Sequence, residues 1–370
     1  MQSNQAISRP TKRHLRVYSY DPSLKLSLKT AVVNSVTISI PWEKHPEKPH
    51  LDGPAPGPVG EYLEIVDYDP ASAGIYAPVD LNNPYILAEH GLQPSDGNPQ
   101  FHQQMVYAVA MKTIVNFEHA LGRLVMWAPR TTRKDGNRKD LFVRKLRLYP
   151  HALREANAYY SPTKKAILFG YFPATDYVSG NHMPGGMVFT CLSHDIIVHE
   201  MTHALLDGMH PYFTEQSNPD ILAFHEAFAD IVALFQHFSY PEVVKHQIGK
   251  TRGSMRVKSL LSDLARQFGR AVGRSGALRS ALGEDPVKYS VEAVFEPHAR
   301  GAILMAAIFD AFISIYDKRT EDLVRLATGG TGVIEEGASL HPDLVNRLAG
   351  EASKAANHVL TMCILSLIHI

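Results

Sequence analysis

The amino-acid sequence predicts an α+β fold of two lobes, and three observations support this expectation. The chain has 370 residues, a length that suits one large domain or two ordinary ones. In the first half, apolar and polar residues alternate over several short segments, which is typical of strands. From Ser193 onward, nearly every apolar segment has helical spacing. We therefore expect a β-rich amino-terminal lobe over residues 1–210 and a helical carboxyl-terminal lobe over residues 211–364.

The first lobe is expected to contain short strands and one long helix. Alternation over residues 25–40 predicts a hairpin centred on residues 34–35, and the proline-rich residues 41–58 predict an irregular surface segment. Residues 101–121 are apolar at helical spacing and are followed by Gly122, which predicts a long helix. Further strands are expected over residues 61–68, 142–149 and 166–172.

The second half of the chain is expected to be helical. Ser193 is a suitable cap for a helix that ends at Gly208, and this helix completes the first lobe. Asn218 and Pro219 begin the next helix, which Pro241 closes. Further helices are expected over residues 255–268, 300–316 and 341–364. Residues 365–370 resemble the translation of a common sequencing adapter, so we expect them to be a non-native tail on a truncated reading frame; the alternative is a natural apolar end of the last helix.

Composition and charge exclude several classes of function. The 37 basic residues balance the 37 acidic ones, which argues against nucleic acid or an anionic membrane as a partner. We find no apolar run of about 18 residues that would predict a membrane span. The basic residues near the amino terminus are followed by no apolar run, so we expect no signal peptide and a cytoplasmic protein, with non-classical export left open. The oligomeric state is left open as well.

The cysteine and histidine counts bear on metal binding. Two cysteines are too few for a disulfide framework or a thiolate zinc cluster, so any metal is expected to rest on histidines and carboxylates. Histidine is abundant, with 19 residues. That abundance favours metal ligation or proton transfer, although a chain can be histidine-rich for no catalytic reason.

The segment His199-Glu200-Met201-Thr202-His203 carries the main chemical signal. On a predicted helix its two imidazoles lie one turn apart on one face, where both can bind one zinc ion. Glu200 can reach a water on that metal without binding the metal itself, which suits a general base. The alternative is a buried helix with two structurally satisfied histidines, because a histidine-rich chain also produces this five-residue pattern by chance.

A catalytic zinc needs a third protein ligand and an open fourth position. Glu226 lies on the next predicted helix, whose short connection allows it to pack antiparallel to the first. Asp230, one turn later, is placed to accept the second ring N–H of a ligating histidine. The alternative for both acids is a solvated helix face, which their apolar neighbours disfavour.

The segment over residues 157–238 resembles the thermolysin family of zinc metalloendopeptidases, through the HExxH motif and the acids that follow it. The resemblance implies a two-lobed gluzincin fold, in which the β-rich lobe ends in the zinc helix and a substrate cleft lies between the lobes. It also implies a role for each residue of the motif. The zinc ligands are His199, His203 and Glu226. The general base is Glu200, and Asp230 is the acid that orients the first ligand.

Other stretches are also similar to that family. Asn157 and Ala158, before Tyr159-Tyr160, resemble the edge-strand residues that bind the substrate main chain. Arg279 is similar to an arginine that contacts the substrate carbonyl, and His298 to a histidine that stabilises the oxyanion. Tyr212 is a candidate for the family's active-site tyrosine.

Structural calcium is left open by the sequence. Members of the family generally bind calcium near the active-site helices, and Asp195 matches one of those ligands. His237, however, stands where another carboxylate is expected. The zinc ion is therefore the cofactor that the resemblance implies, and calcium is an open second one.

The resemblance implies an enzyme that hydrolyses the bonds of a peptide or protein substrate with a zinc-activated water and a glutamate base. Members of the family are normally secreted with a signal peptide and a propeptide, and neither is expected here. Two alternatives therefore stay open. One is a zinc protein that keeps the fold for binding or regulation without proteolysis, and the other is a processing peptidase that acts on a single partner.

Overall fold

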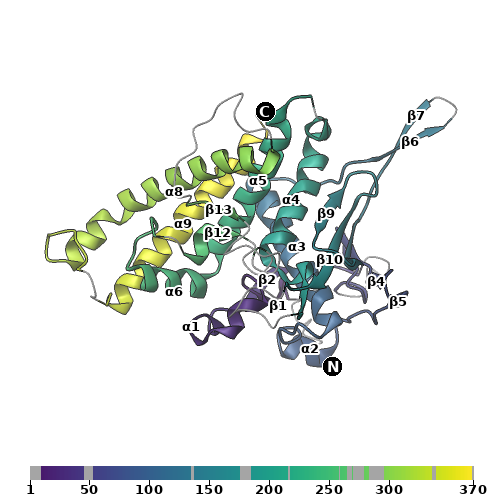
Figure 1. Cartoon of the computed structure of the whole chain (residues 1–370). Coiled ribbons are helices and arrows are strands. Elements are labelled where there is room, and N and C mark those ends of the chain that lie inside the picture. The colour runs from purple at the N-terminus through teal and green to yellow at the C-terminus, as the bar shows by residue number, and fades with distance from the viewer. Residues whose placement is uncertain are drawn as a thin grey trace, which may run out of the picture.

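The computed structural model describes residues 10–45, 53–134, 137–175, 185–215, 217–257, 259–264, 269, 279–282, 296–335 and 339–368. Within these ranges the chain is a mixed α+β structure with several sheets. The strands of the first half lie on one side of the molecule, and the long helices of the second half lie on the other (Figure 1). Helices α3 (Pro99–Leu121) and α4 (His194–Met209) run between them.

The chain begins with an antiparallel pair that the sequence predicted only in part. Strand β1 (Lys12–Tyr18) pairs with β2 (Ser35–Pro41). The expected strand over residues 25–33 is wrong, because Pro22–Leu26 forms a 3-10 turn and α1 spans Leu28–Ala31. The side chain of Asp21 accepts a hydrogen bond from the backbone N–H of Ser23, and this cap starts helical turns in a segment whose alternation had suggested a strand.

The largest sheet positions the candidate site. Its parallel centre consists of β3, β8 and β10, in that order, and β9 and β11 both pair antiparallel with the other edge of β10. Three predicted strands are therefore confirmed, with shifted ends. The bounds are Leu63–Ile65 for β3, Leu146–Leu153 for β8, Ala158–Ser161 for β9, Ala166–Pro173 for β10 and Met187–Phe189 for β11.

Three small two-stranded sheets complete the β structure of the described residues. Each is antiparallel and lies outside the five-stranded sheet. Their strands are β4 (Tyr68–Asp69) with β5 (Gly74–Ile75), β6 (Arg130–Lys134) with β7 (Asn137–Leu141), and β12 (Asp263–Leu264) with β13 (Arg279–Ser280).

Most of the predicted helices are confirmed. Asn98 caps α3 and Gly122 ends it in the left-handed region, at a φ of 64°. The side chain of Asn218 caps α5, and Pro219 is its first residue. The other helices are α2 (Pro84–Ala88), α5 (Pro219–Gln236), α6 (Pro241–Thr251), α8 (Pro297–Ala327) and α9 (Pro342–Ser366).

Three predicted helix features are wrong. Pro241 does not close α5, which ends at Gln236, but is the first residue of α6. Helix α4 continues through Gly208, where an added Cβ would lie 2.1 Å from the carbonyl oxygen of Met126; the glycine permits this close approach and does not end the helix. The helix expected over residues 255–268 is also absent from its described residues, which form the 3-10 turn Leu260–Ser262 and β12. Ser259 has an extended backbone and caps the start of that short turn, so no helix runs through it.

Helix α5 lies at the centre of the helical region and packs against α4, α8 and α9. One hydrophobic core runs from Leu15 on β1 to Leu367 after α9. Helices α5 and α8 are long and apolar enough to cross a membrane, judged by length and composition only. The search of the sequence for long apolar runs did not anticipate this result. The apolar window of the α5 segment is 78% buried inside the molecule, and that of α8 is 39% buried.

Candidate metal centre

Three predicted ligands converge between α4 and α5. The Nε2 atoms of His199 and His203 lie 3.0 Å apart. Glu226 places one carboxylate oxygen 3.1 Å from Nε2 of His199 and the other 3.6 Å from Nε2 of His203. A tetrahedral zinc ion with bonds of about 2.0–2.1 Å needs ligand atoms about 3.3 Å apart. The three side chains therefore have the spacing of a zinc site.

The outer ring nitrogen of His199 is fixed by Asp230. Its Nδ1 lies 2.8 Å from the Asp230 carboxylate, as the sequence predicted for an orienting acid. Because a carboxylate only accepts, Nδ1 carries the proton and Nε2 directs a lone pair toward the other ligands. Asp230 is 2% exposed, so this contact is shielded from water.

His203 has a partner that the predicted site did not include. Its Nδ1 lies 2.6 Å from Nδ1 of His225. Burial, together with the nearby His203, lowers the pKa of His225 to about 3. His225 is thus neutral, and one of the two facing Nδ1 atoms donates to the other, a contact that holds the ring of His203. The sequence placed His225 beside the site but gave no sign that it faces His203.

The Glu226 carboxylate stays ionised. Burial raises its pKa, but the contacts with the ring nitrogens of His199, His203 and His298 outweigh burial and hold the pKa well below its usual range. Two imidazole nitrogens and a carboxylate therefore meet in one place. Such a donor set fits a divalent cation.

His298 reaches this centre from the first turn of α8. Its Nδ1 lies 3.0 Å from a carboxylate oxygen of Glu226, and its side chain is 47% exposed. The side chain of Glu296 caps α8 by accepting hydrogen bonds from the backbone N–H groups of His298 and Ala299. This cap fixes the start of α8, and with it the position of His298 beside a candidate ligand.

Glu200 faces the edge strand β9. Its carboxylate accepts a hydrogen bond of 2.7 Å from the backbone N–H of Tyr160. Farther along α4, Asp207 accepts hydrogen bonds from the hydroxyl of Tyr160 at 2.6 Å and from Nζ of Lys165 at 2.7 Å. Strand β9 and the turn after it therefore contact α4 at two positions along the helix, Glu200 and Asp207. The sequence did not indicate that Asp207 and Lys165 take part in this contact.

The predicted substrate-binding residues are placed less fully. Asn157 is exposed directly before β9, and Ala158 is the first residue of that strand, paired with Phe169. Arg279 lies in β13 opposite Leu264, and its side chain is outside the described structure. Residues 285–289, which accompany it in the resemblance, also lie outside the described residues.

Tyr212 follows α4 in the 3-10 turn Pro211–Thr214 and is 75% exposed. Within the described residues, no hydrogen bond joins its side chain to the three candidate ligands. Its assignment as an active-site residue therefore stays a prediction based on the resemblance.

The open question of calcium concerns a buried cluster of His194, Asp195 and His237. Nε2 of His237 contacts the Asp195 carboxylate, and the ring of Tyr20 stacks on His237 with centroids 3.9 Å apart. Calcium prefers six to eight oxygen ligands. Among the described residues, this cluster offers one carboxylate beside two imidazoles, a donor set that does not suit calcium.

No family model matches this chain, and no curated protein matches it. What supports the candidate centre is therefore the chemistry of its own residues: two imidazoles whose outer nitrogens are held, an ionised carboxylate, and a second glutamate that is not a ligand.

Proposed function

We propose that this protein is a zinc-dependent metallopeptidase that hydrolyses peptide bonds. The observation that carries the proposal is the convergence of His199, His203 and Glu226 at ligand spacing, with Glu200 beside them on α4 and tied to an edge strand. A structural zinc site would be closed by a fourth protein ligand, whereas three ligands next to an additional carboxylate are typical of a catalytic site. The proposal includes a two-lobed thermolysin-like fold in which the β-rich lobe ends at α4.

The proposed chemistry divides between the metal and the chain. Zinc, when bound, supplies Lewis acidity toward the scissile carbonyl and lowers the pKa of a water. The Glu200 carboxylate takes the proton of that water and passes it to the leaving amine. The backbone N–H of Tyr160 holds the carboxylate in place for this transfer. His298, whose Nδ1 lies 3.0 Å from the Glu226 carboxylate, is the proposed partner of the oxyanion.

Strand β9 is the proposed platform for the substrate main chain. Within the described residues it pairs with β10 along one edge, and no other strand pairs with its second edge, where a substrate strand could be added. Asn157 and Ala158 stand at the start of that edge, and Tyr160, which holds Glu200, lies two residues farther on. A peptide added there would run past the proposed general base. Arg279 and Tyr212 enter the proposal from the resemblance alone.

The direct test is cleavage of a diverse peptide library, read by mass spectrometry with and without a zinc chelator. We expect cuts that the chelator abolishes and that added zinc restores. A protein that binds zinc stoichiometrically but cleaves nothing would contradict the peptidase proposal and favour the binding or regulatory alternative.

The variant Glu200→Gln tests the general base. Glutamine keeps an oxygen that can accept from Tyr160 N–H but cannot take a proton, so zinc content should be unchanged and turnover should fall by about 10²- to 10⁴-fold. Glu242→Gln, an exposed change on α6, is the matched control and should alter neither quantity. If Glu200→Gln also loses zinc, Glu200 acts on the metal site itself and the base assignment is wrong.

A further inference from the structure

A second group of metal-binding side chains is buried where α3, β8 and the turn before α4 meet. His102 lies on α3, His151 on β8 and Cys191 on the 3-10 turn Thr190–Leu192. These residues are 1%, 2% and 0% exposed. One ring nitrogen of each histidine and the sulfur all lie within 4.8 Å of one another. None of these residues belongs to the proposed peptidase site.

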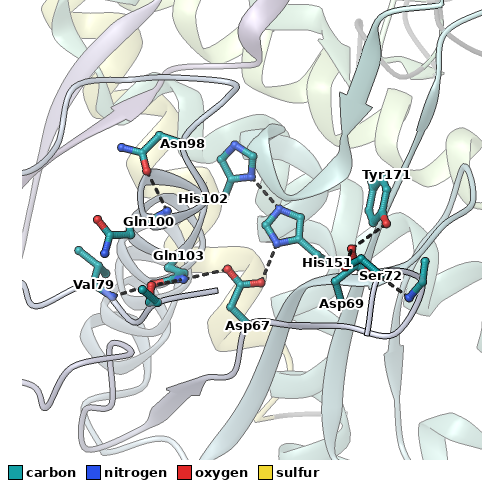
Figure 2. A network of polar contacts seen from close by, with 12 residues as sticks. Asp67, Asp69, Ser72, Val79, Asn98, Gln100, His102, Gln103, His151 and Tyr171 are labelled. Atoms are coloured by element: carbon teal, nitrogen blue, oxygen red, sulfur yellow. Dashed lines mark hydrogen bonds and ion pairs between the residues drawn. The ribbon is translucent and has the colours of Figure 1, made fainter. Parts of the chain in front are cut away.

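Both histidines are held from outside by groups that accept hydrogen bonds. Nε2 of His102 lies 3.0 Å from the backbone carbonyl oxygen of Asp96, and Nδ1 of His151 lies 2.6 Å from the carboxylate of Asp67. The other oxygen of Asp67 accepts a hydrogen bond of 2.8 Å from Nε2 of Gln103. Figure 2 shows this chain of contacts from Gln103 through Asp67 and His151 to His102.

These partners determine which ring nitrogens carry protons. A carbonyl oxygen and a carboxylate only accept, so the protons of the neutral rings lie on Nε2 of His102 and on Nδ1 of His151. The remaining nitrogens, Nδ1 of His102 and Nε2 of His151, face each other at 2.8 Å. Two lone pairs at that distance repel each other. The cluster therefore needs a positive charge between the rings, either an additional proton or a metal cation.

Cys191 favours the cation. Its sulfur lies within 4.8 Å of the facing ring nitrogens and supplies a third ligand that a bridging proton does not need. A divalent ion, the thiolate of Cys191 and the carboxylate of Asp67 sum to zero charge, so the ion adds no net charge to this buried place. Burial raises the pKa of the free Cys191 thiol well above its usual range, but a bound cation removes that proton outright. Ligating histidines also commonly donate their second N–H to a carboxylate or a backbone carbonyl, as both rings do here.

We propose that His102, His151 and Cys191 form a second, buried site for a thiophilic divalent ion such as Zn²⁺. Two imidazoles and a thiolate are the ligand types that zinc prefers. Binding requires the facing nitrogens to separate from 2.8 Å to about 3.3 Å, which small rotations of the two rings provide. The ion would fix α3 and the sheet to the turn that leads directly into α4.

The test measures metal in the full-length protein before and after native dialysis against a zinc chelator, and again after unfolding in guanidinium chloride. We expect one ion that survives native dialysis and leaves only on unfolding, because its ligands are buried. An ion in the proposed catalytic site should leave during dialysis, since the side chains of Glu226 and His203 are 21% and 13% exposed.

Cobalt substitution identifies the ligands. Protein produced in cobalt-supplemented medium should show thiolate-to-cobalt charge-transfer absorption in the near ultraviolet, which the His199, His203 and Glu226 set cannot give because it contains no sulfur. Cys191→Ser should abolish both this absorption and the chelator-resistant ion. The matched control Cys363→Ser, a change at a free thiol outside the cluster, should keep both. If Cys191→Ser does not fold, the cobalt spectra of the wild type and of Cys363→Ser still show whether a thiolate other than that of Cys363 binds the metal.

A protein without a chelator-resistant ion and without the thiolate band would overturn this inference, and an added proton would then bridge the two histidines. That result leaves the proposed peptidase untouched, because peptide cleavage depends on the chelator-labile ion. Conversely, a resistant ion with a thiolate band, found in a protein that cleaves no peptide, would support the second site and contradict the peptidase.

Discussion

Replacing Asp230 by alanine tests how the centre is held together. The Asp230 carboxylate lies 2.8 Å from Nδ1 of His199 and is almost fully buried. In Asp230→Ala that N–H loses its acceptor, the imidazole can rotate, and Nε2 becomes a weaker donor to the metal. Loss of such an outer partner typically lowers metal affinity by about 10- to 100-fold. This corresponds to a loss of about 1.4–2.7 kcal/mol of zinc-binding free energy.

The assay is the zinc dissociation constant of the chelator-labile ion, measured by competition with a fluorescent indicator. Asp230→Asn, which keeps an oxygen acceptor, should lose less affinity than Asp230→Ala. Asp322→Ala, an exposed change on α8, should lose none. An Asp230→Ala protein that is folded by circular dichroism and binds zinc within about twofold of the wild type would refute the reasoning, because the expected loss is about tenfold at least.

Three further predictions concern the packing around the centre. Tyr160→Phe removes the partly buried hydrogen bond to the Asp207 carboxylate and should cost about 1.5–3 kcal/mol in guanidinium unfolding. An unchanged midpoint would contradict the tie between β9 and α4. Gly301→Ala places a Cβ 2.7 Å from the carbonyl oxygen of Ala223 and 3.0 Å from the backbone nitrogen of Ala227. Forcing α8 away from α5 should destabilise the protein by about 1–3 kcal/mol, seen as a lower Tm; a raised Tm would show that the helices separate freely. Protein whose zinc has been removed by a chelator should gain about 2.7 kcal/mol of unfolding free energy when zinc is added at about 100 times its Kd. An unchanged unfolding midpoint would mean that zinc does not bind the native state preferentially.

The α4 and α5 part of the site could be predicted because its information is local. His199 and His203 occupy one helical face by spacing alone, and Glu226 and Asp230 occupy one face of the next helix. A short connection then brings the two faces together. The structure confirms the predicted contact between Asp230 and His199, because helical geometry leaves few other positions for side chains placed in this way.

The incorrect predictions arose where capping and backbone contacts overrode periodicity. Asp21 starts a 3-10 turn next to a segment whose apolar spacing suggested a strand. Ser259 starts another in a segment whose apolar spacing suggested a helix. Pro241 was interpreted as the end of α5, whereas it is the first residue of α6, the position in a helix that proline tolerates best. A proline marks a boundary, but not which side of the boundary is helical.

Non-local contacts are the other feature that the sequence could not supply. The low cysteine count suggested that metal binding would rest on histidines and carboxylates. The fold nevertheless brings Cys191 to His102 and His151, which are distant in sequence and come from different elements. His225 was noted as a neighbour, yet its contact with His203 depends on the relative rotation of α4 and α5. Sequence spacing determines which residues share a face, and only packing determines what that face meets.

Helix α4 is constrained on several sides, and this bears on how precisely a metal can be held. Strand β9 contacts it through Glu200 and Asp207, and α5 contacts it through Asp230 and His225. Ligand atoms 3.0–3.6 Å apart from two different helices keep that spacing only if the helices cannot slide. Close-packed interiors resist such sliding, because moving one helix opens voids along its whole length. Metal affinity and folding stability should therefore change together in variants that loosen α4, even when no ligand is altered.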